Sequence, residues 1–138
     1  MNRAFTVSTR QTGHPRRVRV VVYDTADEMR AAAQKYRNAA DGFINAIGVS
    51  QPRFRGIIAG TELGMRAYPG CGVVRLVRGE MGAAVLAHEM THMALAIYRE
   101  DSGRASLRNM KNEEMLCHIV SDLVRSANRQ FWKAGIYQ

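Results

Sequence analysis

VVRLVRGEMGAAVLAHEMTHMALAIY, residues 73 to 98, joins a short β-branched run to a long segment of helical composition. The opening VVRLV, Val73 to Val77, is typical of a strand, and Gly79 ends that run. From Met81 to Tyr98 the chain has no proline and only Gly82 near the start, so we predict a helix there. We therefore expect a sheet that packs on this helix.

The predicted helix contains HEMTH at residues 88 to 92, an HExxH pattern. Residues four positions apart lie on one face of a helix, about 6 Å from each other, so the imidazoles of His88 and His92 can reach one Zn²⁺ ion. Zinc lowers the pKa of bound water to about 7, and Glu89 can take the proton as hydroxide attacks a carbonyl. The pattern predicts His88 and His92 as metal ligands and Glu89 as the catalytic base. The alternative is that both histidines are ordinary helix residues.

A third protein ligand is expected, because two histidines alone would hold zinc weakly. Glu113 and Glu114 follow His92 in the sequence, at the start of the last predicted helix. We favour Glu114, since it shares a helical face with Cys117 and His118 at i+3 and i+4, and Glu113 is the alternative third ligand. His118 could hydrogen-bond a ligand or replace the glutamate as third ligand. Acids in a first turn are also stabilised by the helix dipole without any metal.

The other predicted elements are a strand at Arg17 to Tyr23, a helix from its cap Thr25 to Gly42, a strand at Phe54 to Ala59, a polar connection after Arg99, and a last helix from about Asn109 or Asn112 to Trp132. Together they predict a single α+β domain over residues 1-138. We expect a small mixed or antiparallel sheet of about three to five strands, packed against the HExxH helix and the C-terminal glutamate-bearing helix. The N-terminal helix should lie outside or opposite, and the metal in the cleft between the sheet edge and the helices.

An HExxH motif followed by a glutamate on a second helix resembles the gluzincin class of zinc metallopeptidases, which have a zincin-like fold. A nearer likeness is local, because EMLCH at residues 114 to 118 resembles the glutamate helix of small ImmA/IrrE-like and phage or bacterial metallopeptidases. The likeness extends over about Val73 to Val124. The chain departs from the thermolysin-like pattern NExxSD, because no aspartate stands four residues after Glu113 or Glu114.

This resemblance implies a minimal zincin-like metallopeptidase that hydrolyses a peptide bond through a zinc-bound water activated by Glu89. It implies Zn²⁺ as the cofactor, held by His88, His92 and a glutamate, and a peptide or protein as the substrate. It also implies an edge strand that pairs with extended substrate, and by position we expect that strand at Val73 to Val77.

The composition leaves a second function open. The chain has 138 residues, 46% of them apolar, and a formal net charge of +8 that comes mainly from dispersed arginines. Such a charge attracts acidic partners, so the alternative is a basic nucleic-acid-associated or regulatory protein with a structural or vestigial zinc site. No nucleic-acid-binding motif accompanies the arginines. Because the sequence has no secretory signal and no apolar run of about 20 residues, we expect a cytoplasmic protein without a membrane partner. The sequence indicates no oligomeric state.

Overall fold

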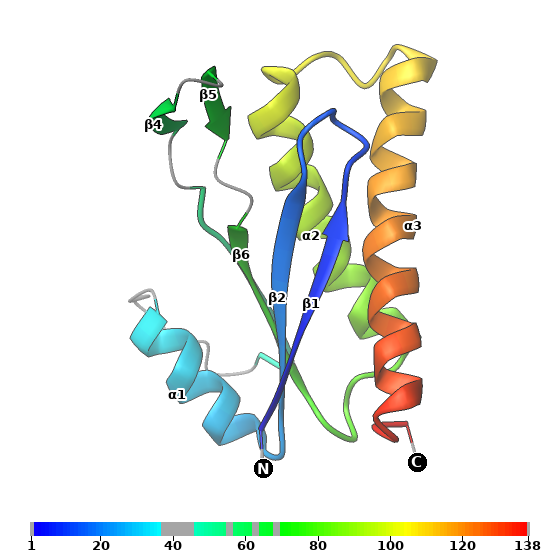
Figure 1. Ribbon diagram of the computed structural model, residues 1–138. Coiled ribbons are helices and arrows are strands. Elements are labelled where there is room, and N and C mark those ends of the chain that lie inside the picture. Colours follow the sequence, from blue (N-terminus) through cyan, green and yellow to red (C-terminus); the bar gives the residue numbers. More distant parts are fainter. Residues whose placement is uncertain (1, 37–45, 55–56, 62–63, 68–69, 138) are drawn as a thin grey trace.

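The computed structural model describes residues 2–36, 46–54, 57–61, 64–67 and 70–137. Within them the chain forms an α+β structure with a four-stranded mixed sheet, a separate two-stranded sheet and three helices (Figure 1). In chain order the elements are β1 (Arg3–Thr9), β2 (Arg16–Tyr23), α1 (Ala26–Tyr36), β3 (Gly48–Pro52), β4 (Ile57–Thr61), β5 (Gly64–Ala67), β6 (Gly70–Val77), α2 (Ala83–Ser102) and α3 (Met110–Lys133). The predicted α+β class and small mixed sheet are confirmed.

The main sheet has the strand order β1-β2-β6-β3, so β6 lies inside it. β2 and β6 run parallel, with Val20 beside Val74, whereas β1 is antiparallel to β2 and β3 is antiparallel to β6. The prediction that Val73 to Val77 forms the edge strand is therefore wrong. These residues are all buried, as expected for a strand covered on both faces, and β3 is the edge strand on this side of the sheet.

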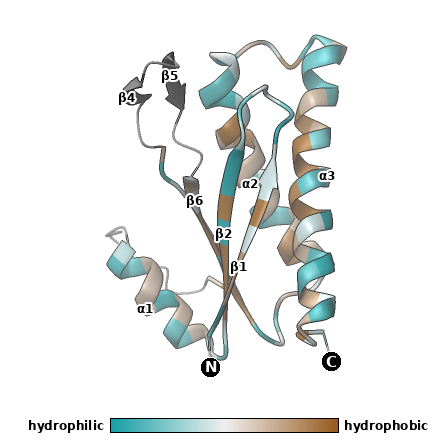
Figure 2. Ribbon diagram, viewed as in Figure 1, coloured by the Kyte–Doolittle hydropathy of each residue, from teal (hydrophilic) through white to brown (hydrophobic). Residues whose placement is uncertain are grey.

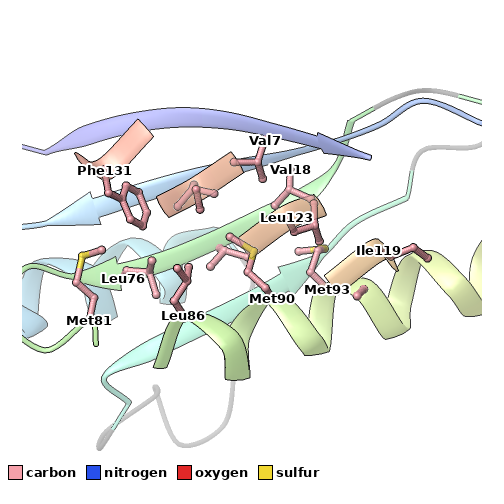
Figure 3. Packing of buried hydrophobic residues seen from close by; sticks show 14 of the residues in the cluster. Val7, Val18, Leu76, Met81, Leu86, Met90, Met93, Ile119, Leu123 and Phe131 are labelled. Atoms are coloured by element: carbon pink, nitrogen blue, oxygen red, sulfur yellow. The ribbon is translucent and has the colours of Figure 1, made fainter. Parts of the chain in front are cut away.

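Helices cover both faces of the main sheet (Figure 1). α2 and α3 pack on one face, and Figure 3 shows Leu86, Met90 and Met93 of α2 lying against the strands. α1 packs on the other face through Met29 and Ala33. The hydrophobic run of β6 lies between these layers (Figure 2). The N-terminal helix thus lies opposite the helix that carries HExxH, as predicted.

The starts of α1 and α3 follow the capping residues in the sequence. Thr25 Oγ1 accepts a hydrogen bond of 3.2 Å from the backbone N–H of Glu28, and Asn109 Oδ1 accepts one of 2.9 Å from Lys111 N–H. Both predicted starts are confirmed, while the predicted end of the first helix lies at residues 37–45, outside the described residues. Along the described chain no helix is long and apolar enough to cross a membrane.

The predicted polar connection after Arg99 begins later than expected, because α2 continues to Ser102. Gly103 ends the helix in the left-handed conformation, with φ of 63°. The last turn is held by Asp101, whose carboxylate accepts hydrogen bonds from Arg16 Nε at 3.0 Å and Thr12 Oγ1 at 2.6 Å. A second bond from Arg16 Nη2 completes a bidentate pair. Polar sequence at this point therefore forms an anchored helix end and not a loop.

Candidate functional site

One face of α2 borders a groove beside the edge strand β3. Leu86, Met90 and Met93 turn toward the sheet and fix the rotation of the helix. That rotation brings to the groove a second set of α2 residues, whose positions recur every three or four residues along the helix. This set consists of Ala84, Val85, His88, Glu89, His92, Leu95, Ala96 and Arg99.

The groove has two hollows that meet at Glu89. The Arg99 hollow, of about 430 Å³, lies between β3 and the part of α2 from Glu89 to Arg99. The Ile47 hollow, of about 380 Å³, extends from Glu89 to Ala84 and is bounded by Ile47. Ala46, Gly48 and Glu89 line both hollows. Because β3 ends the described sheet, its outer backbone edge has no strand partner among the described residues, and it runs beside this groove.

The imidazole rings of His88 and His92 lie next to each other on α2. Their Nε2 atoms are 3.1 Å apart, the ring centroids are 4.8 Å apart, and the ring planes cross at 78°. Two nitrogens bound at about 2.05 Å to one tetrahedral zinc ion are separated by about 3.3 Å. Both rings are exposed, so a solvent ion can reach them. The pair has the donor atoms and the spacing of two ligands to one metal ion.

Glu89 is buried, unlike His88 and His92, with 7% of the residue exposed. Its Oε1 lies 4.0 Å from Nε2 of His88. Burial raises the pKa of the Glu89 carboxyl above its usual value, and the neighbouring charges of His88 and His92 act against this rise. A carboxylate with a raised pKa is a better proton acceptor, and this one lies close to the ring of His88.

β3 contacts α2 closely at Glu89. Ser50 Oγ donates a hydrogen bond of 2.9 Å to the backbone carbonyl of Glu89. A Cβ added to Gly48 would stand 3.0 Å from Glu89 Cγ and 3.1 Å from Val85 Cγ1, so a larger residue would displace the carboxylate stem. The edge strand therefore fixes both the backbone and the side chain of Glu89.

The structure does not bring the predicted third ligands to the two histidines. Glu113, Glu114 and His118 are all exposed on α3, and His118 Nε2 lies 3.6 Å from Glu114 Oε2. Among the described residues there is no group of three or more His, Cys, Asp or Glu side chains that could hold one metal ion. The assignment of Glu114, or of Glu113 or His118 in its place, stays a prediction.

Sequence reasoning missed the part of the site that comes from β3. Gly48 and Ser50 belong to GVSQP, a segment that lacks the β-branched and aromatic density typical of strands. The segment itself carries no signal that would have identified it as a strand. Arg99 was likewise not singled out, because its place in the groove depends on the rotation of α2.

No protein-family model matches this chain, and comparisons with curated proteins and with solved structures give no significant match.

Proposed function

We propose that this protein is a zinc-dependent metallopeptidase. The observation that carries the proposal is the convergence of His88 Nε2 and His92 Nε2, 3.1 Å apart, beside the buried carboxylate of Glu89. The same three residues border a groove along an edge strand. Two ring nitrogens for a metal, a buried base and a groove along an edge strand are parts that peptide hydrolysis needs.

Each part of the site has a role in this proposal. His88 and His92 would hold the ion. Glu114, or alternatively Glu113 or His118, stays the predicted third ligand, and it would have to approach the two rings from its place on α3. Bound zinc supplies a water with pKa near 7 and polarises the substrate carbonyl. The carboxylate of Glu89 would accept a proton from the attacking water and then donate it to the leaving amine.

The edge strand would hold the substrate. The outer backbone of β3 offers N–H and C=O groups to an extended peptide, which would add as a further strand above Glu89. Main-chain pairing of this kind binds many sequences, so side-chain preference would come from the two hollows. This assigns to β3 the role that the family resemblance predicted for Val73 to Val77.

Metal analysis tests the proposal directly. Protein purified without chelator should contain stoichiometric zinc by mass spectrometry, and His88→Ala should abolish it because one of two converging ligands is removed. Glu114→Ala should also lose zinc, whereas Glu113→Ala should retain it. Glu80→Ala, which removes an exposed acid outside the groove, is the matched control and should keep the metal. Loss in Glu113→Ala or in His118→Ala instead would move the third ligand to that residue.

The opposite result is equally clear. If wild-type protein contains no zinc and regains none when zinc is added, the metallopeptidase proposal fails. The basic surface would then be the better guide to function.

A second candidate function rests on the main sheet. Arginine is the only charged residue type in its four strands. Arg17 and Arg19 are exposed beside the exposed hydroxyls of Thr6 and Ser8, on the face that carries α1, and no described carboxylate pairs with either arginine. This open basic face suits the phosphates of nucleic acid.

Salt dependence tests this second candidate. If duplex DNA binds the face, removing Arg17 and Arg19 together should lower the slope of log K against log salt by about 1.8, or about 0.9 for each phosphate contact. The double variant Arg125→Ala/Arg129→Ala changes net charge equally at exposed positions of α3 and should leave the slope unchanged. Equal losses in both double variants would show a general charge effect without a binding face.

A further inference from the structure

The two hollows of the groove differ in chemistry. Apart from His88 and Glu89, the Ile47 hollow has only apolar and glycine residues in its lining. The Arg99 hollow has an apolar floor too, from Leu95, Ala96 and Pro52, but it carries a cation at its far end. A chain lying along the groove would therefore meet different surroundings on the two sides of Glu89.

Arg99 is available to a ligand. Arg99 is exposed, and neither an ion pair nor a hydrogen bond joins its side chain to another described residue. Two other arginines are engaged, since Arg16 binds Asp101 and Arg75 binds Gln51. Guanidinium groups bind carboxylates with paired, charge-assisted hydrogen bonds.

Helix geometry sets the distance between this cation and the reacting centre. Arg99 follows His92 by seven residues on the same α2 face, and seven residues at 1.5 Å each amount to about 10 Å. An extended peptide advances about 3.3 Å per residue, so about three residues of substrate would span this length. Leu95 and Ala96 lie on the helix between the two and would contact the intervening side chains.

We propose that Arg99 makes the groove selective for peptides that carry a carboxylate about three residues from the scissile bond, on the His92 side. On the other side the Ile47 hollow would accept an apolar residue. This inference rests on the proposed peptidase function and specifies its substrate class. The carboxylate could belong to an aspartate, a glutamate or the end of the chain, and the shared chemistry is one anionic group held by one guanidinium.

A peptide library can test the preference. Wild-type protein loaded with zinc is incubated with peptides from a digested proteome, and cleaved bonds are identified by mass spectrometry. We expect acidic residues to be enriched about three- to tenfold at the third residue on one side of the cleaved bond. Arg99→Gln should abolish this enrichment and Arg99→Glu should replace it with lysine and arginine. Arg125→Gln, the same change at an exposed position of α3, should retain it.

Failure of the inference and failure of the proposed function give different results. Cleavage without an acidic preference, or with a preference that Arg99→Gln leaves unchanged, would overturn the role of Arg99 and leave the peptidase proposal standing. Absence of any cleavage would count against the peptidase.

If no cleavage is found, a binding measurement still tests whether Arg99 selects peptides with a carboxylate. The probes are two fluorescein-labelled alanine-rich nonapeptides, with glutamate or glutamine three residues from the centre, and the protein is Glu89→Gln. We expect the glutamate peptide to bind three- to tenfold more tightly by anisotropy, a gap that Arg99→Gln in the same background should close. Equal binding of both peptides to Glu89→Gln protein would overturn the inference.

Discussion

Glu89→Gln is expected to lower kcat for peptide hydrolysis by about 10²- to 10⁴-fold, because the amide cannot accept the proton that the carboxylate takes. The substitution preserves size and leaves the Ser50 hydrogen bond, which goes to the backbone carbonyl of residue 89. It also leaves His88 and His92, so the zinc content should not change. The measurements are kcat on a cleaved peptide, zinc by mass spectrometry, and unfolding in urea.

Glu100→Gln provides the control for this prediction. It is the same chemical change on the same helix, at an exposed residue that lines neither hollow, and it should keep full activity. A Glu89→Gln protein that binds zinc, folds normally and retains more than about a tenth of kcat would remove Glu89 from the role of base.

The His88 and His92 pair could be predicted from sequence because its geometry is local. Once Met81 to Tyr98 is helical, the i and i+4 positions fix how the two rings face each other. The third ligand has no such local rule, since it depends on how α3 lies against α2. For the same reason the sequence alone could not choose between Glu113, Glu114 and His118.

The strands, too, could be predicted where their own sequence indicates them and not where they depend on contacts with distant residues. The apolar pattern identified β2 and β6, and the run of β6 without polar alternation indicates a strand covered on both faces. Its place inside the sheet depends on the pairing with β2 and β3 and could not be predicted from this pattern. β3 was missed since Gly48, Ser50 and Pro52 have low strand propensity, and its pairing with β6 compensates for this. An edge strand tolerates residues of low strand propensity, including proline, whereas an interior strand such as β6 does not tolerate proline.

Asp101→Asn is expected to lower the free energy of unfolding by about 3–5 kcal/mol, the usual cost of breaking a buried ion pair. The side chains of Arg16 and Asp101 are only 4% and 2% exposed, so the asparagine variant removes a carboxylate charge from a buried ion pair. The pair also joins β2 to the end of α2. Urea unfolding near pH 7 gives the comparison. Asp27→Asn removes the partner of Arg30 in an exposed pair, where the carboxylate is 98% exposed, and should cost less than about 1 kcal/mol.

The pH dependence should show that the effect comes from the Asp101 charge. Burial alone would raise the pKa of Asp101, but hydrogen bonds from Arg16 and Thr12 and the charge of Arg16 outweigh it and hold the pKa below its ordinary value of 3.8. An acid whose pKa is lower in the folded state stabilises fully above its unfolded pKa and loses that contribution as pH falls through the folded pKa. The stability difference between wild type and Asp101→Asn should therefore be constant above about pH 5 and shrink below about pH 4. A difference no larger than that of Asp27→Asn, or one that persists unchanged to low pH, would show that the Asp101 carboxylate does not anchor α2 through its charge.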